Sequence, residues 1–323
     1  MKCHIVPQVY QKKWNTGTAN GENVFYFDKN LNLLKPNGGN VKSHMQIEDY
    51  YILSLNEISD IGDSALSPNM VEDYFSSTIE NNWNTVYELF EAGSSKILTP
   101  LKKFFKEYQA SSPADPSITG VRRGDLTGVE KEIGALEDFL ILQLYRRYEN
   151  MENHIEKLFD SIPKPSGLTK DNEAAIKRMM WLKFLADCAK SGTNVLSETR
   201  KILLDKYSIL VAFADSTKFI LSDNPVIFNN LKLNEYIAHG LFIAISPDTM
   251  IMFCDLSEWC KTNPHVKKDD IIAVHGTDDA VKQFNNILLK NSFKEVGFFN
   301  KDIDSHIDSN VDKNSFYKML GIN

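Results

Sequence analysis

Two short polar clusters near opposite ends of the chain contain the residue types that chemistry would need. The first is His4–Gln8 (HIVPQ) and the second is Ser222–Pro225 (SDNP). A proline restricts the backbone in each cluster, and the flanking residues are apolar and expected to be buried. Polar side chains are rarely placed beside a core unless they satisfy one another or a ligand. The two clusters are therefore the best candidates for a functional site.

The chemistry expected of these clusters is general acid–base catalysis. If the fold brings His4 to Asp223, the carboxylate would fix the imidazole tautomer and favour its charged form. Asn224 would then donate a hydrogen bond to substrate, and the helix start after His4 would offer backbone N–H groups to an anion. Two structural alternatives stay open. His4 is then a satisfied core residue, and Asp223 and Asn224 bond their own backbone as an Asx turn.

Gln143 gives independent support for a polar pocket. It lies in the segment 139–145 (FLILQLY), where every other residue is apolar around all faces of the expected helix. A buried amide without partners costs on the order of 1–3 kcal/mol, so something must hydrogen-bond it. Arg146 follows, and its guanidinium could hold a carboxylate or phosphate bidentately. A surface ion pair with Glu149 is the alternative role for this arginine.

Other motifs are weaker. Arg147 and His154 match the R-x4-6-H spacing of certain helical ribonucleases, a spacing that is common by chance. The sequence has no P-loop, GxGxxG, GxSxG or HExxH motif. Its histidines have no spacing suited to metal binding. We therefore expect no metal and no other cofactor.

Composition is that of an ordinary globular chain. The 323 residues, 42% of them hydrophobic, are enough to bury a core without a metal or a disulfide. A net charge of −7 argues against a broad cationic surface for nucleic acid, although local patches stay open. The four cysteines lack CxxC spacing, and no apolar run suits a signal peptide or a membrane span. We expect a reduced, cytoplasmic protein without membrane association.

Periodicity predicts the secondary structure. Apolar residues at spacings of three and four predict helices over 69–92, 101–108, 129–160, 170–190, 195–206 and 278–290, with a short helix from Pro7. Runs rich in Val, Ile and Phe predict strands over 1–6, 24–27, 31–34, 50–54, 208–214, 218–221, 226–228, 241–245, 250–254 and 296–299. Turn residues between the strands favour antiparallel pairing. Residues 111–128 are rich in Pro, Gly and Ser and are predicted to be a loop.

The fold class expected from these elements is α+β and predominantly helical. An antiparallel sheet would form from the N-terminal hairpin and the C-terminal strands, with the central helical block 69–206 packed on it. One domain is expected over 1–300, followed by a polar C-terminal tail over 301–323. Such a sheet would bring His4 and Asp223 together, because both flank strands that could share it.

The two clusters also resemble a widespread, mainly bacterial family catalogued as domain of unknown function 4238. His4–Tyr10 (HIVPQVY) resembles its HYVPQFY opening, and Phe219–Val226 (FILSDNPV) is similar to its FITSDNPVV signature. Ile245–Pro247 resembles a later PLSP, and the order and spacing extend over about residues 2–300. The chain departs from the family pattern after Arg146, where Arg147 and Tyr148 replace a Thr-Pro pair. Either arginine could therefore be the equivalent one.

The resemblance implies a polar set drawn from several elements, which is more typical of a site than of a turn. Carried over to this chain, the set is His4, Gln8, Glu80, Gln143, Arg146, Ser222, Asp223, Asn224 and Asn285 or Asn286. We expect an enzyme, a candidate hydrolase or nuclease, in which His4 is the acid/base, Asp223 orients it and the others bind substrate.

The expected substrate is phosphodiester- or nucleotide-like, either a small molecule or a nucleic acid, and a toxin or phage-defence effector is the expected setting. The alternative is a non-catalytic module that binds a ligand or protein with the same pocket. The family name implies no established activity, and the sequence leaves the oligomeric state open.

Overall fold

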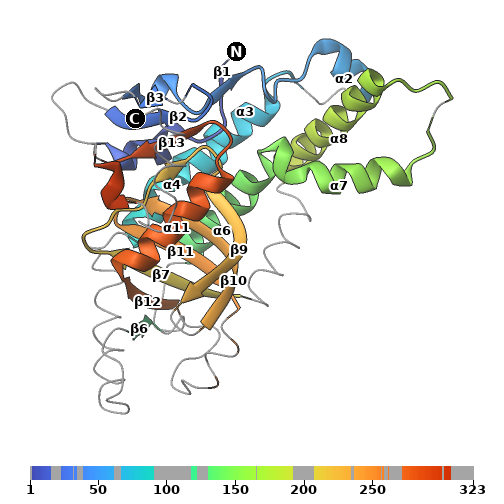
Figure 1. Cartoon of the computed structure of the whole chain (residues 1–323). Helices are drawn as coiled ribbons and strands as arrows, with labels where there is room; N and C mark the ends of the chain where they lie inside the picture. Colours follow the sequence, from blue (N-terminus) through green and yellow to red (C-terminus); the bar gives the residue numbers. More distant parts are fainter. Residues whose placement is uncertain are drawn as a thin grey trace.

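Helices and three β-sheets make up the described part of the chain, which confirms the α+β class (Figure 1). The sheets join segments that are far apart in the sequence, so the two clusters of interest are placed by long-range pairing. The computed structural model describes residues 2–15, 23–31, 33–34, 39–61, 67–90, 118–121, 130–164, 166–191, 207–233, 236–255, 257, 261, 271–299 and 302–306.

The largest sheet comes mostly from the second half of the chain. Its strand order is β6-β12-β7-β11-β10-β9, and the pairs are antiparallel except that β12 runs parallel to β7. This exception corrects the expectation of purely antiparallel pairing. Parallel neighbours need a long crossover, and here several strands lie between the two in the chain. The bounds are β6 Ile118–Val121, β7 Ser208–Ala214, β9 Val226–Leu233, β10 Tyr236–Ser246, β11 Thr249–Cys254 and β12 Ile271–Gly276.

A second sheet combines both ends of the chain. Its order is β3-β2-β13-β8, and β4 also pairs with β2. In its centre β2 pairs antiparallel with β13, with Phe27 opposite Val296. The bounds are β2 Asn23–Asp28, β3 Leu33–Leu34, β4 Gly39–Asn40, β8 Leu221–Ser222 and β13 Glu295–Phe298.

His4 lies on neither of these sheets. It ends β1 (Lys2–His4), which pairs only with β5 (Gln46–Glu48) in a two-stranded sheet. The expectation that His4 and Asp223 flank strands of one sheet is therefore wrong. The strand expected over 50–54 is also displaced to β5, because Asp49 has a positive φ of 51° and turns the chain there.

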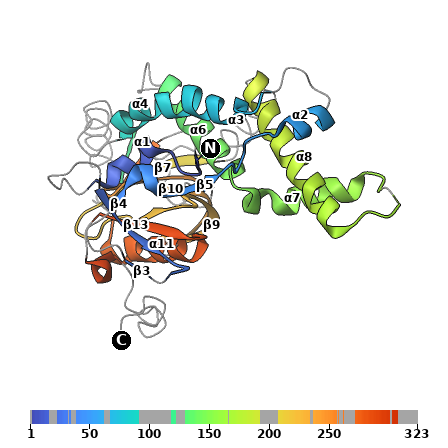
Figure 2. The same ribbon diagram turned by 90° about the horizontal axis from the view of Figure 1, so that it is seen from above.

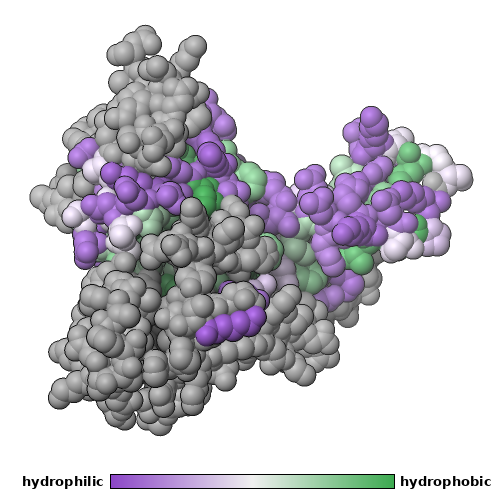
Figure 3. Space-filling view, turned by 60° about the horizontal axis from the view of Figure 1, so that its bottom comes forward, coloured by the Kyte–Doolittle hydropathy of each residue, from purple (hydrophilic) through white to green (hydrophobic). Residues whose placement is uncertain are grey.

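Helices cover the six-stranded sheet on both faces. The side chains of β11 are all buried, and Figure 2 shows α11 on one side of the sheet and α4 with α6 on the other. α7, α8 and α2 project from this body as an arm, and a hollow separates the arm from the body in Figure 3. The bounds are α1 Gln8–Gln11, α2 Leu55–Ile61, α3 Met70–Tyr74, α4 Asn81–Phe90, α6 Glu130–Tyr145, α7 Tyr148–Ser161, α8 Lys170–Ser191 and α11 Asp278–Asn291.

The helix expected over 129–160 is in fact two helices. α6 ends at Tyr145, and Arg147 is the N-cap of α7 with an extended backbone (φ −97°, ψ 120°). The apolar stripe continues across the break and no Pro or Gly marks it, so periodicity alone could not find it. The break matters because it directs two consecutive arginines to different places.

Other expectations are confirmed or corrected locally. The helix expected over 69–92 extends through α3 and α4, but a π-helical stretch over Phe75–Glu80 joins them. Four residues of the expected loop 111–128 form β6, which pairs with β12 and needs no apolar pattern of its own to do so. The expected helices 101–108 and 195–206 lie outside the described residues.

The first helix anchors the N-terminal cluster to the core. Tyr10 donates its hydroxyl to the carbonyl of Ala244, and the Trp14 indole N–H donates to the carbonyl of Phe219 at 2.8 Å. The Tyr10 ring also packs on Trp83 and Phe139, with centroids 5.3 and 5.6 Å away. This packing fixes the direction in which the preceding residues leave the helix.

The Asn285 side chain, on α11, hydrogen-bonds to two other stretches of backbone, at residues 218–220 and at His306. Its Oδ1 accepts from the N–H of Ile220 at 3.1 Å, and its Nδ2 donates to the carbonyls of Lys218 and His306, each at 2.8 Å. His306 belongs to a 3-10 turn over Ile303–His306 and is itself buried. Within the tail expected from residue 301, the described residues 302–306 are therefore held to the rest of the structure at His306.

We predict that Asn285→Ala lowers the free energy of unfolding by several kcal/mol, since two buried partners and one partly buried partner each lose a bond worth on the order of 1–3 kcal/mol. Urea denaturation measures the change. The matched control is Gln283→Ala, an exposed amide on the same helix, which should change stability by less than about 0.5 kcal/mol. Equal effects of the two substitutions would contradict the bridging role of Asn285.

Candidate functional site

The backbone that carries His4 is held at every carbonyl from residue 4 to residue 7. The Tyr51 hydroxyl donates to the carbonyl of His4 at 2.6 Å, and Gln143 Nε2 donates to that of Ile5 at 2.6 Å. The carbonyl of Val6 accepts from Gln11 Nε2 at 2.7 Å, and that of Pro7 accepts from the backbone N–H groups of Tyr10 and Gln11. The buried Gln143 thus has a partner, as its position predicted, but that partner is backbone rather than a ligand.

The His4 imidazole remains half-buried beside Gln8. The Gln8 amide nitrogen lies 3.2 Å from His4 Nε2 and 3.4 Å from its Nδ1. An amide nitrogen can only donate, so the ring nitrogen that accepts from it is unprotonated. The structure thus brings together the two polar side chains of the first cluster.

Arg146 lies behind this segment and is fully buried. Its Nε donates to the Tyr51 hydroxyl at 2.8 Å, and its Nη2 donates to the same oxygen. Its Nη2 and Nη1 lie 3.7 Å from Glu72 Oε2 and 3.8 Å from Glu80 Oε1. Phe75 covers the guanidinium, with its centroid 4.3 Å from Cζ. Two carboxylates and a hydroxyl therefore occupy this cation.

Burial and charge act in opposite directions in this cluster. Burial lowers the pKa of Arg146, but Tyr51, Glu80 and Glu72 outweigh it, so the pKa stands above its ordinary value. Burial also raises the pKa of Glu80, although Arg146 partly offsets the effect. The expectation that Arg146 binds a substrate anion is corrected, because its charge is already balanced inside the protein.

Asp223 does not pair with His4. Its Oδ1 accepts from the backbone N–H of Phe293 at 2.9 Å, and its Oδ2 accepts from Lys294 and Glu295 at 2.7 and 3.0 Å. Burial raises the pKa of Asp223, while these bonds and the charge of Arg147 lower it. The carboxylate fixes the chain where β13 begins, so its expected role as the orienter of His4 is wrong.

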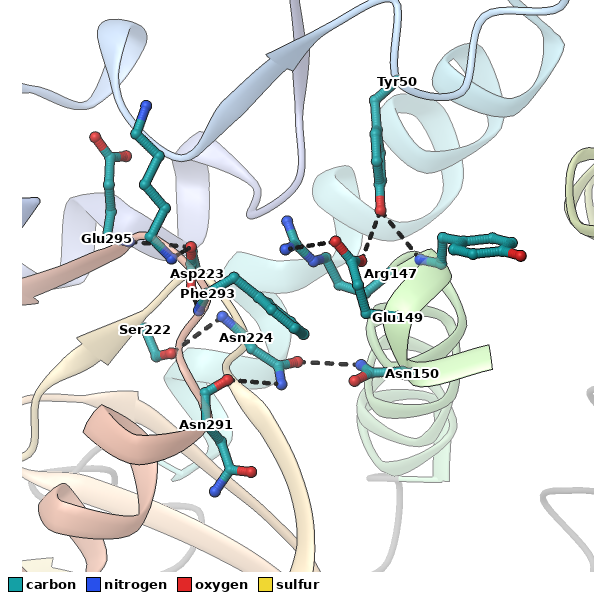
Figure 4. A network of polar contacts seen from close by, with 12 residues as sticks. Tyr50, Arg147, Glu149, Asn150, Ser222, Asp223, Asn224, Asn291, Phe293 and Glu295 are labelled. Atoms are coloured by element: carbon teal, nitrogen blue, oxygen red, sulfur yellow. Dashed lines mark hydrogen bonds and ion pairs between the residues drawn. The ribbon is translucent and has the colours of Figure 1, made fainter. Parts of the chain in front are cut away.

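Ser222 and Asn224 form a local turn, but its side-chain acceptor is the serine hydroxyl and not Asp223 or Asn224, as the Asx-turn alternative had it. Ser222 Oγ accepts from the Asn224 N–H at 3.0 Å. The Asn224 side chain then reaches two helices, because its Oδ1 accepts from Asn150 Nδ2 and its Nδ2 donates to the Asn291 carbonyl (Figure 4). The cluster therefore joins α7 to α11.

Arg147 is the least satisfied polar group of this network. Its side chain is 3% exposed, yet its Nε and Nη1 make no hydrogen bond within the described residues. Only Nη2 donates, to Glu149 at 3.3 Å. The guanidinium carbon lies 4.2 Å from the Phe293 ring centroid and 5.8 Å from that of Tyr50. A buried cation with open donors is the strongest indication of a ligand here.

The polar set expected from the sequence thus divides into two networks. His4, Gln8, Gln143, Arg146 and Glu80 belong to the first, and Ser222, Asp223 and Asn224 to the second. Asn285 belongs to neither, since its amide is used by backbone. The only link that the sequence hinted at is the adjacency of Arg146 and Arg147, one in each network.

Sequence reasoning missed several members of both networks. Glu72 precedes Glu80 by eight residues on the same helical stripe, a spacing that could have suggested it. Tyr51 and Asn150 gave no such signal, because a tyrosine after a turn and an exposed-looking amide are both common. The residues missed are Tyr50, Tyr51, Glu72 and Asn150, and Arg147 was left as an alternative to Arg146.

The remaining sequence motifs do not converge on a site. His154 is exposed on α7 whereas Arg147 is buried, which separates the two members of the ribonuclease-like spacing. Among the described residues no three or more His, Cys, Asp or Glu side chains gather as a metal site would require. No described helix combines the length and apolar character that crossing a membrane requires.

Comparison with known families gives a match that spans both clusters. The family model described as "Protein of unknown function (DUF4238)" matches residues 2–302. The chain belongs to this family. No curated protein and no solved structure matches the chain significantly. Family membership therefore fixes the relationship of the chain but assigns no reaction, and any function has to be argued from the geometry.

We predict that replacing the two arginines changes stability by very different amounts. Arg146→Met leaves two partly buried carboxylates and the buried Tyr51 hydroxyl without their cation, and should lower the free energy of unfolding by about 3 kcal/mol. Arg147→Met removes a buried cation with unused donors, but Asp223 then loses a nearby positive charge, so the free energy of unfolding should stay within about 1 kcal/mol of the wild type. Urea denaturation of both variants is the measurement. A loss in Arg147→Met as large as in Arg146→Met would show that Arg147 is also a structural ion.

Proposed function

We propose that this protein is an enzyme that acts on a phosphodiester- or nucleotide-like substrate, with His4 as its general acid/base. The observation that carries the proposal is the anchoring of all four carbonyls from His4 to Pro7 around a half-buried imidazole. A catalytic side chain needs such a fixed backbone, because small displacements from the productive geometry lower the rate steeply.

Gln8 suits both protonation states that an acid/base must pass through. In the observed contact its amide nitrogen faces the imidazole, which suits the base. Rotation of the amide by half a turn would present its oxygen to a protonated ring, which suits the acid. Gln8 therefore acts as a positioning residue that follows the proton on His4.

The chemistry of a phosphodiester matches this device. His4 would take the proton of the attacking water or hydroxyl, and would return a proton to the leaving oxygen as the phosphorus–oxygen bond breaks. Such a step needs an acid/base whose pKa lies near the working pH, as that of an imidazole ordinarily does. General acid–base catalysis of this kind contributes roughly 10²–10⁴-fold to the rate. Asp223 has no part in it, since backbone amides occupy both of its oxygens.

A non-catalytic binding module is the second candidate, and the open donors of Arg147 favour it. Those donors recognise an anion without any need for turnover. A toxin or phage-defence role stays a prediction for either candidate, with growth arrest on expression in bacteria as its readout.

We predict that His4→Ala lowers hydrolysis of phosphodiester probes by at least about 10²-fold while the melting temperature changes little. The probes are bis(p-nitrophenyl) phosphate, a cyclic mononucleotide, single-stranded RNA and double-stranded DNA. The matched control is His154→Ala, an exposed histidine on α7, which should retain the full rate. Gln8→Ala should give an intermediate rate, because it disturbs the position of the imidazole and not the proton transfer itself.

Two outcomes would count against catalysis at His4. Absence of turnover by the wild-type protein on every probe would favour the binding module. A full rate in His4→Ala, together with a loss in His154→Ala, would assign the chemistry to the arm instead.

A further inference from the structure

We infer that Arg147, at the start of α7, forms a binding site for the phosphate group of a small ligand. The site does not depend on catalysis by His4. Figure 4 shows the guanidinium extending from the start of α7 toward Asp223 and Phe293, with Glu149 beside it. The donors, their surroundings and their charge each support this assignment.

Most of the N–H donors of the Arg147 guanidinium are unused within the part of the chain that the structure describes. Nε carries one N–H and Nη1 carries two, so three of the five guanidinium donors have no partner within the described residues. The neighbouring Arg146 is equally buried, but hydroxyl and carboxylate groups occupy it. The two adjacent arginines are thus similarly buried, but only Arg147 has guanidinium donors without a partner among the described residues.

Two aromatic rings lie against the Arg147 guanidinium. The Phe293 and Tyr50 rings pack on the guanidinium, and its N–H groups all point outward along its edge. Phosphate oxygens meet an arginine at this edge, commonly through two parallel hydrogen bonds. Phe293 is itself 37% exposed, so the buried edge lies directly beneath the surface.

Glu149 occupies part of the position that a bound anion would take. One of its oxygens accepts from Arg147 Nη2 at 3.3 Å and the other from the Tyr50 hydroxyl at 2.8 Å. The Glu149 side chain is 39% exposed and can turn into water without a large desolvation cost. A phosphate that displaces it would inherit these two donors and gain the unused ones.

Electrostatics set the preference for an anion. Arg147 is the N-cap residue of α7, a helix of 14 residues, and has no side-chain cap bond there. The positive end of that helix adds to the arginine charge. Asp223 acts against it, but three backbone N–H groups share its charge. Glu149 is therefore the main competitor for the site.

Isothermal titration calorimetry of the full chain with inorganic phosphate and with adenosine 5′-monophosphate tests the site. Wild-type protein should bind both, and Arg147→Met should weaken binding at least roughly tenfold. Arg147→Lys should weaken it less, because the charge stays while the two-pronged geometry is lost. Glu149→Gln should strengthen binding several-fold, because a competing carboxylate is removed. Tighter binding of the nucleotide than of phosphate would identify a nucleotide site, and equal binding a free-anion site.

Two controls separate this proposal from the previous one. His4→Ala should bind phosphate as the wild type does, whatever happens to turnover, and Lys164→Met should also leave binding unchanged because Lys164 pairs with Asp160 at the far end of α7. Failure of the wild-type protein to bind either probe would overturn the site. So would unchanged binding in Arg147→Met and Glu149→Gln, since binding would then occur elsewhere.

Discussion

The buried guanidinium of Arg146 is the constraint on which the N-terminal cluster depends. It cannot lose its proton, so its charge has to be balanced inside the protein, and Glu72 and Glu80 do so from the helix on either side of Phe75. The hydroxyl of Tyr51 then transmits this fixed position to the carbonyl of His4. One charge cluster therefore sets where the segment His4–Gln8 lies.

The break between α6 and α7 gives two consecutive arginines different tasks. A continuous helix would have set them about 100° apart on one surface, whereas the extended backbone at Arg147 points its side chain toward the SDNP corner. Arg146 holds the first cluster in place. Arg147 lies beside the second cluster, and its Nε and Nη1 have no hydrogen-bond partner among the described residues. The second cluster is itself rigid, because Asp223 and Asn224 tie β13, α7 and α11 together.

Local patterns allowed most elements to be predicted, and tertiary pairing decided the rest. The helices near 170–190 and 278–290 were predicted because their apolar stripes are regular and their ends are marked. The strand β6 was missed because it pairs with β12 through its backbone and has no apolar pattern of its own. The break between α6 and α7 was missed because no Pro or Gly marks it. The parallel pairing of β7 with β12 joins strands that have several other strands between them in the sequence. Turn residues indicate only how strands that follow each other in the chain are paired.

The candidate site shows the same division. The burial of Gln143 and the need of Gln143 and Asp223 for hydrogen-bond partners followed from the residues, since polar groups beside apolar runs need partners. Which partners they find did not follow, because backbone groups are available at every position. Asp223 and Asn285 satisfy backbone, and Arg147 is the member whose donors are left over.

Proton NMR of the two arginine Nε–H groups in protein labelled with [15N]arginine tests the central claim, that Arg146 is satisfied internally and Arg147 is not. Each signal is assigned from its substituted variant. Addition of inorganic phosphate should shift the Arg147 signal and slow its exchange with water, while the Arg146 signal stays unchanged. A shift of Arg146 alone, or no response from either group, would contradict the account.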